Sequence, residues 1–137
     1  MNQTVVASLD RSGALAPWRA QRVSAFIEAN IEQRMTAEDA ARVVNLSTSH
    51  FSRAFKRSFG QTVHGFIMRK RIERAQQLML STSEELSSIA VSCGLSDQSH
   101  LTRWFRRVVG ETPGSWRRAS RSGTGEQAAV QEMTRFQ

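Results

Sequence analysis

Residues 48–62 read TSHFSRAFKRSFGQT, and residues 98–112 read QSHLTRWFRRVVGET. When the second stretch is laid over the first at an offset of 50, seven of the fifteen positions are identical. Chance identity over that length is about one position, so the chain contains a duplicated unit. Upstream of these stretches the offset falls to 49, which places one extra residue of the second copy near Asp97. Two copies are too few for a solenoid and predict two similar modules.

Each copy has the residue pattern of a helix, a tight turn and a second helix. In the first copy we expect Thr36 and Ser47 to cap the two helices and Asn45 to adopt the left-handed conformation of the turn. In the second copy we expect Ser83 to cap the first helix and Gly94 to lie in the turn. In the first copy, the second helix is expected to end at Gly60 and to bury Phe51, Ala54, Phe55 and Phe59. In the second copy, it is expected to end at Gly110 and to bury Leu101, Trp104, Phe105 and Val108. The sequence therefore predicts a helix-turn-helix motif twice.

The remaining apolar periodicity predicts an all-α, homeodomain-like fold of about seven helices. One long linker helix is expected to join two helix-turn-helix subdomains, and a Thr112 cap followed by Pro113 is expected to open a short last helix. The two ends of the chain lack helical periodicity, and the C-terminal end is expected to be disordered. The predicted order is a tail or linker (residues 1–17), a first subdomain (18–62), the linker helix (63–80), a second subdomain (81–119) and a C-terminal tail (120–137).

The charge of the chain favours an anionic partner. Nineteen Lys and Arg stand against twelve Asp and Glu in 137 residues, which gives a formal net charge of +7. Seven cations against one acid lie in residues 47–74, and six against two lie in residues 97–121. Seventeen of the cations are Arg, whose planar guanidinium suits two-point contacts with phosphate and guanine. Because solvated helix faces also carry such blocks, the charge alone does not distinguish a nucleic-acid-binding surface from an ordinary solvated helix face.

Several classes of protein are disfavoured by what the sequence lacks. Cys93 is the single cysteine, so no intrachain disulfide or cysteine-based zinc cluster can form, and we expect it to be a small buried hydrophobe. The chain has neither an apolar run long enough for a membrane span nor a signal-peptide pattern, which predicts a cytoplasmic protein without membrane contact. No catalytic triad, metal-ligand cluster or glycine-rich phosphate loop is visible, so we expect no enzyme activity, no metal and no cofactor. His50 and His100 are interpreted as polar boundary residues.

The face opposite the apolar stripe of each second helix carries polar and cationic side chains. A helix-turn-helix motif places the N-terminal part of its second helix in the major groove, where Arg bonds guanine and Gln bonds adenine. The candidate base contacts are Ser49, Ser52 and Arg53 in the first copy and Gln98, Ser99, Thr102 and Arg103 in the second. The candidate contacts to the DNA backbone are Thr48, Lys56, Arg57, Arg106 and Arg107.

Other cations have a second interpretation that the residues leave open. Arg57 and Arg107 fit phosphate contacts and ion pairs within the domain equally well. Arg69, Lys70 and Arg74 suit backbone phosphates or a solvated helix face. Arg71 either lies on that face or is partly buried beside an acid such as Glu38.

Three stretches of the chain together resemble a known family. They are DAARVVNLSTSHFSRAFKRSFG at 39–60, RKRIERAQQLM at 69–79 and SIAVSCGLSDQSHLTRWFRRVVGETPGSWRR at 88–118, and they resemble the DNA-binding domain of AraC/XylS-type bacterial transcription regulators. The resemblance runs from about Trp18 to Arg118 and is more specific in the second half. Asn45 stands where the family usually has Gly, and Val63 stands where Pro is frequent. The resemblance implies two helix-turn-helix modules joined by a long helix, and base contacts at the positions named above.

The sequence therefore predicts a sequence-specific transcription regulator, an activator by analogy with the family, that binds double-stranded DNA as a monomer. RNA polymerase is a candidate partner. One chain with two reading helices can span two major-groove segments about 34 Å apart. Two alternatives stay open. The chain can be a DNA-binding fragment of a larger ligand-responsive regulator, because residues 9–18, LDRSGALAPW, resemble an interdomain linker, or it can be a non-specific architectural DNA-binding protein.

Overall fold

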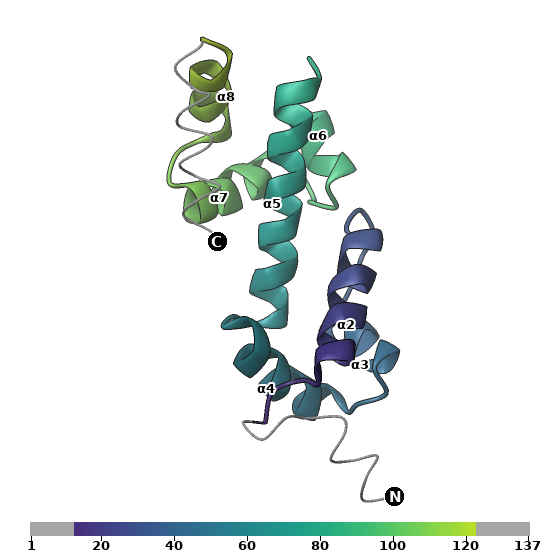
Figure 1. The fold of residues 1–137 in the computed structure, drawn as a ribbon. Helices are drawn as coiled ribbons and strands as arrows, with labels where there is room; N and C mark the ends of the chain where they lie inside the picture. Colours follow the sequence, from purple (N-terminus) through teal and green to yellow (C-terminus); the bar gives the residue numbers. More distant parts are fainter. Residues whose placement is uncertain (1–12, 123–137) are drawn as a thin grey trace, which may run out of the picture. The chain divides into compact units, whose positions relative to one another are not determined.

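The computed structural model describes residues 13–122, which form seven helices (Figure 1). The predicted all-α fold is confirmed, and so is the long helix between the two helix pairs. The disorder predicted for the C-terminal tail falls on residues 123–137, which lie outside the described residues, as do residues 1–12. The helices are α2 Pro17–Ala29, α3 Ala37–Val43, α4 Thr48–Phe59, α5 Val63–Ser81, α6 Leu86–Ser92, α7 Gln98–Val109 and α8 Pro113–Arg121.

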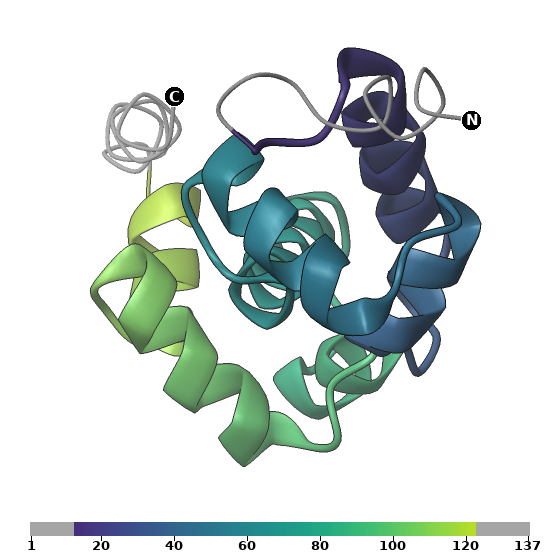
Figure 2. The same cartoon turned by 90° about the horizontal axis from the view of Figure 1, so that it is seen from below.

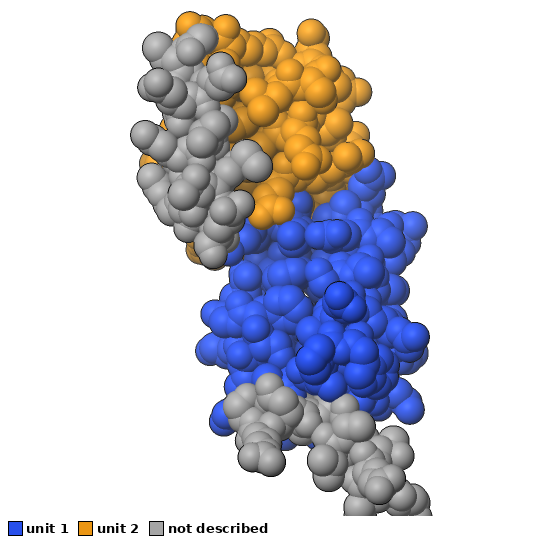
Figure 3. Space-filling model, in the orientation of Figure 1, with its two compact units in different colours: residues 1–70 blue, residues 71–137 orange. Residues whose placement is uncertain are grey.

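The contacts within the chain divide it into two compact units, residues 1–70 and residues 71–137 (Figure 3). The boundary between the units falls inside α5, so this helix contributes to both. Unit 1 contains the first helix-turn-helix pair, α3 and α4, and unit 2 contains the second pair, α6 and α7. The exact subdomain limits expected from the sequence stay a prediction.

In unit 1, α3 packs against both α2 and α4 (Figures 1 and 2), and the core contains residues of α2, α3, α4 and the start of α5. Ala40 and Ala41 of α3 are fully buried, and their small side chains let the helices approach closely. The apolar face of α4 is buried as predicted at Phe51, Ala54 and Phe55, and Phe59 is partly buried beside them. The ring of Phe55 lies 4.3 Å from that of Phe59 and 5.3 Å from that of Phe66 in α5, between ring centroids, and this aromatic cluster fixes α4 on the long helix.

In unit 2, α7 contacts both α6 and α8. Leu101 and Phe105 are fully buried, and the Phe105 ring meets the Trp116 ring of α8 edge-on at 5.8 Å between centroids. The expected burial of Val108 and Trp104 is wrong, because both are only half-buried and Val109 is buried in their place. Residues 101, 105 and 109 follow one row at a spacing of four, and this row faces the core.

Most predicted helix ends are confirmed. Thr36 forms a capping box with Asp39, in which the Thr36 backbone N–H donates to Asp39 Oδ2 at 3.0 Å and the Asp39 N–H donates to Thr36 Oγ1 at 3.2 Å. The hydrogen bond from the Thr36 backbone is the largest cause of a lowered pKa for the Asp39 carboxyl. Ser47 and Thr112 cap α4 and α8 through their hydroxyls. Asn45, with φ 60°, occupies the left-handed turn position as predicted, and Gly60, Gly94 and Gly110 also have positive φ.

The predicted Ser83 cap is wrong. Helix α6 begins at Leu86 with Glu85 as its N-cap residue, and no side chain caps it. The preceding residues are held instead by Arg117 of α8, whose guanidinium donates to the backbone carbonyls of Met79 at 3.1 Å, Thr82 at 2.7 Å and Glu84 at 2.6 Å. These bonds fix the end of α5 and the stretch before α6, so α6 starts after Ser83. Desolvation lowers the pKa of Arg117, and the nearby Arg121 charge lowers it further.

Replacing Arg117 by alanine is expected to lower the free energy of unfolding by about 2 kcal/mol, because three carbonyl groups lose a charged donor. Arg117→Lys should lose most of the same stability, since an ammonium group cannot reproduce the fork of a guanidinium. Urea denaturation followed by circular dichroism measures both changes. Arg118→Ala, at the exposed neighbouring position, is the matched control and should stay within about 0.5 kcal/mol of the wild type. Equal losses of unfolding free energy for Arg117→Ala and Arg118→Ala would show that the hydrogen bonds of Arg117 do not stabilise the fold.

Candidate nucleic-acid interface

Two helices of twelve residues each, α4 and α7, carry all twelve side chains that the sequence assigns to DNA. Helix α4 starts after Ser47, whose hydroxyl accepts the His50 backbone N–H at 3.3 Å. Helix α7 starts after Asp97, whose Oδ1 accepts the His100 N–H at 2.8 Å. Both helices end at a left-handed glycine. The second helices of the two modules therefore have the same length, and both have side-chain-capped N-termini.

The extra residue of the second copy is accommodated at the start of α7. Ser96 matches Ser47 in the repeat, but Asp97, one residue later, takes over as the cap. His100 Nδ1 accepts the Ser96 backbone N–H at 3.3 Å and lies 3.1 Å from the Ser96 hydroxyl. His100 thus fixes the turn ahead of α7. His50 and His100 are both half-buried, in keeping with their interpretation as boundary residues.

On α4, the assigned side chains lie on the outer face of the helix. Ser52 is half-buried, and the other five assigned residues, Thr48, Ser49, Arg53, Lys56 and Arg57, are exposed. The side chains at 49 and 52 are short, so Arg53 is the long side chain in the N-terminal half of the helix. Direct contact of α4 with base edges would depend mainly on this guanidinium.

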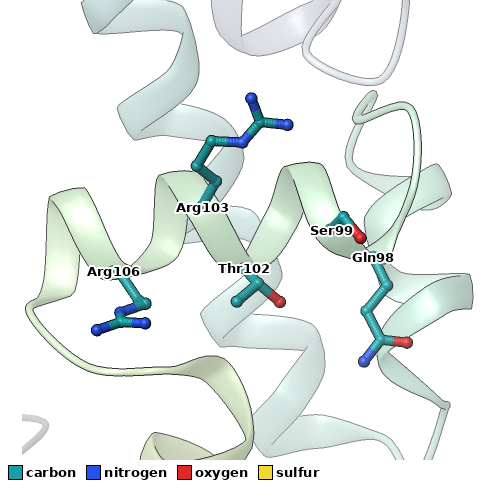
Figure 4. A pocket seen from close by; sticks show the side chains of 5 residues that line it. All are labelled: Gln98, Ser99, Thr102, Arg103 and Arg106. Carbon is teal, nitrogen blue, oxygen red and sulfur yellow. The ribbon is translucent and has the colours of Figure 1, made fainter.

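On α7, five assigned side chains line one open hollow of unit 2 (Figure 4). They are Gln98, Ser99, Thr102, Arg103 and Arg106. Gln98, Thr102 and Arg106 are four residues apart and project from one side of the helix, while Arg103 extends on the opposite side from Arg106 (Figure 4). The hollow therefore groups Arg106, which the sequence assigns to the DNA backbone, with four residues assigned to bases. The arrangement offers amide, hydroxyl and guanidinium groups within one surface.

Arg57 and Arg107 are the equivalent cations of the two copies. Neither lines that hollow, and each contacts a different kind of neighbour. The guanidinium carbon of Arg107 lies 4.7 Å from the centre of the Trp104 ring, a cation–π contact. Arg57 lies against Gly13, where a methyl group added to the Gly13 Cα would come within 3.4 Å of Arg57 Cδ. Both side chains are therefore supported by the fold while their residues stay exposed.

The cations of the long helix are partly used inside the fold. Lys70 Nζ lies 3.3 Å from Glu28 Oε1 of α2, which is an ion pair within unit 1. Arg71, left open by the sequence, is buried at 8% exposure, and this burial lowers its pKa while the neighbouring Cys93 acts in the opposite direction. Cys93 is buried, as predicted. Glu38, the suggested acid, forms an exposed ion pair with Arg42 at 3.4 Å.

Arg19 and Arg117 are two structural arginines that sequence reasoning missed. Arg19 is buried at 7% exposure, and its Nε donates to the Val44 carbonyl at 2.9 Å, which pins the turn before α4. Its pKa is lowered, first by desolvation and then by the Arg22 charge. A signal for Arg19 exists, because residues 19, 23 and 27 form one row on α2 and the other two are apolar. Arg117 bonds only main-chain carbonyls in the contacts above, and such partners leave no pattern in the sequence.

The described residues hold neither a metal cluster nor a membrane span. Over residues 13–122, no three His, Cys, Asp or Glu side chains are placed to share a metal ion. No helix in this part of the chain is both long and apolar enough to span a membrane.

Comparisons with known proteins point to one family. A helix-turn-helix domain family matches residues 40–119, which is more than half of the chain. The HTH-type transcriptional regulator ArgR of Pseudomonas aeruginosa is 31% identical over 115 residues, which cover 84% of this chain and 35% of ArgR. The chain spans only about a third of the length of the curated relatives it matches first.

Solved structures share the arrangement of helices. A transcriptional regulator from Chromobacterium violaceum, described as having an AraC-type DNA-binding domain, superposes with a TM-score of 0.70 at 30% identity, over 75% of this chain and 91% of that one. The DNA-binding domain of AdpA, crystallised with a target DNA, gives a TM-score of 0.72 over 76% of this chain and 94% of that one. At 24% identity, the likeness to AdpA shows a shared fold and nothing more.

Proposed function

This chain belongs to the AraC/XylS-type family of bacterial transcription regulators, and we propose that it is a sequence-specific regulator that reads two successive major-groove segments of double-stranded DNA with α4 and α7. It is a transcriptional regulator with an AraC-type DNA-binding domain. We also propose that it acts as an activator and that the side chains assigned above on α4 and α7 make the contacts to the DNA.

The observation that carries the proposal is the hollow on α7 lined by Gln98, Ser99, Thr102, Arg103 and Arg106. A Gln side chain can pair with adenine N6 and N7, and an Arg can pair with guanine O6 and N7. Charge alone would suffice for non-specific binding, whereas an amide and hydroxyls beside the guanidinium groups add donors and acceptors that distinguish bases. Arg53 supplies the equivalent guanine reader on α4. The backbone contacts assigned to Thr48, Lys56, Arg57, Arg106 and Arg107 would fix the register of both helices on the duplex.

The wider role is proposed by analogy with the family. We assign the chain a cytoplasmic location, no enzyme activity and RNA polymerase as a partner in activation. Two reading helices in one chain do the work that usually needs a dimer, so we propose binding as a monomer. Since the matched residues cover only about a third of the curated relatives, a DNA-binding part of a longer ligand-responsive regulator is the second candidate.

Selection of binding sites from random duplex DNA with the purified chain tests the proposal. We expect a motif of two blocks whose centres lie about one helical turn, 10–10.5 base pairs, apart. Arg53→Ala should relax one block and Arg103→Ala the other, and each should cost about 1–3 kcal/mol of binding free energy on the wild-type site.

Arg42→Ala is the matched control, because Arg42 is an exposed arginine of α3 outside both reading faces. This variant should select the wild-type motif with nearly unchanged affinity. If the wild-type chain selects no motif and its affinity depends only on salt, the proposal fails and the chain is a non-specific DNA binder.

A further inference from the structure

The short segment ahead of α2, residues 13–16, is docked on the C-terminal half of α4. Ala14, Leu15 and Ala16 are buried at 7%, 4% and 7% exposure. The Leu15 backbone N–H donates to the Ser58 hydroxyl of α4 at 2.7 Å, and Gly13 lies against the side chain of Arg57. Figure 2 shows this purple segment beside α4. Gly13 has φ +84°, a conformation that a residue with a side chain adopts only with strain, so the segment follows a path that requires glycine here.

The repeat shows why this docking matters for Arg57 in particular. Arg57 and Arg107 are the same position of the two copies, and Arg107 is supported by the ring of Trp104. The position of Trp104 is Ala54 in the first copy, which has no ring to offer. Conversely, the position of Ser58 is Val108 in the second copy, which has no hydroxyl to accept a backbone N–H. One cation is therefore supported by an aromatic ring, and the other has a docked stretch of backbone.

We propose that residues 13–16 are a positioning element for DNA binding, which holds the Arg57 side chain in place to contact a backbone phosphate. The inference rests on the proposed function, because Arg57 acts here as a phosphate contact. A flexible cation loses side-chain freedom when it is fixed on a phosphate, and a support that restricts it beforehand reduces that loss. The Leu15–Ser58 hydrogen bond anchors the segment to α4, and Gly13 lies beside the Arg57 side chain, whose Cδ and Nε would lie 3.4 and 3.5 Å from a methyl group on the Gly13 Cα.

A double-mutant cycle on the selected duplex tests this assignment. Arg57→Ala should weaken binding about threefold to tenfold at moderate salt and reduce the magnitude of the salt slope by about 0.9. Gly13→Ala should weaken binding by about twofold to fivefold with Arg57 present, because a residue with a side chain is strained at φ +84° and relief of this strain displaces the segment from Arg57. In the double variant the loss should equal that of Arg57→Ala alone, since no guanidinium remains to be positioned.

The matched control uses the second copy. Arg107→Ala removes the equivalent cation, which is supported by Trp104. The affinity of the Gly13→Ala/Arg107→Ala double variant should therefore fall by the product of the two single fold-losses. Ser58→Ala removes the anchor without touching Gly13 and should behave as Gly13→Ala does in a cycle with Arg57→Ala. This second cycle decides the matter if Gly13→Ala fails to fold. All measurements are made at a temperature where circular dichroism shows every variant to be folded.

The outcomes separate this inference from the proposed function. Losses that multiply in both Arg57 cycles, or variants at Gly13 and Ser58 that lower Tm but leave affinity unchanged, would make the segment a structural element only. If Arg57→Ala leaves both affinity and salt slope unchanged on a duplex that the wild type selects, the inference fails while the proposed function stands. If the wild type selects no duplex, the proposed function itself has failed.

Discussion

Raising the KCl concentration from about 50 to 200 mM is expected to weaken binding to the selected duplex about a hundredfold. Four proposed backbone contacts carry this expectation, namely the exposed cations Lys56, Arg57, Arg106 and Arg107. Each neutralised phosphate releases condensed counterions, so the logarithm of the association constant falls against the logarithm of salt with a slope of about −0.9 per contact. Four contacts give a slope of about −3.6. Fluorescence anisotropy titrations over a series of salt concentrations measure this slope directly.

Single variants apportion the slope among the side chains. Lys56→Ala and Arg106→Ala should each reduce its magnitude by about 0.9. Gln98→Ala removes a neutral side chain and should lower affinity with the slope unchanged. A wild-type slope close to zero would contradict the backbone assignments as a group. An unchanged slope for Arg106→Ala, together with a relaxed motif, would instead move Arg106 to the base contacts, beside the four residues that share its hollow.

Helix ends proved predictable from sequence where the stabilising partner is local. The Thr36 cap closes with Asp39, three residues away, so both halves of the bond are visible in one short stretch. Asn45 could be placed in the left-handed turn because few other residues with a side chain tolerate that conformation. Ser83 satisfies the same local rule, yet α6 starts later because Arg117 holds the preceding backbone from 33 to 38 residues away. Local propensity was overridden there by a tertiary contact.

The sequence predicts which helix faces carry the candidate site. It does not predict which contacts hold the individual side chains in place. Helical periodicity places Arg103 and Gln98 on the outer face of α7, and the structure exposes both. The same periodicity cannot decide between Val108 and Val109 as the buried residue, because both lie near the apolar stripe and packing makes the choice. The docking of residues 13–16 escaped prediction for a different reason. The segment has no periodicity, and its hydrogen bond uses a backbone N–H that every residue except proline possesses.

The variant Phe105→Ala is expected to lower the free energy of unfolding by about 3–5 kcal/mol, the usual result of emptying a fully buried aromatic position. Phe105 is 0% exposed at the centre of α7, and its ring packs edge-on against Trp116 of α8. The cavity would lie directly beneath the face that carries the proposed base contacts of the second module. Urea denaturation measures the loss, and hydrogen exchange of backbone amides locates it. Amides of α6, α7 and α8 should lose protection, whereas those of α2, α3 and α4 should retain it.

Phe55→Ala is the matched variant in the first module, since Phe55 is the equivalent residue of the repeat and is also 0% exposed. It should cost a similar free energy and reverse the pattern of lost protection, because the two units have separate cores around α4 and α7. Val91→Ala, at a position 64% exposed on α6, should change stability by less than about 0.5 kcal/mol. If Phe105→Ala instead removes protection evenly from both units, they unfold as one cooperative body. The long helix α5, which crosses the boundary between the units, would then be the element that couples them.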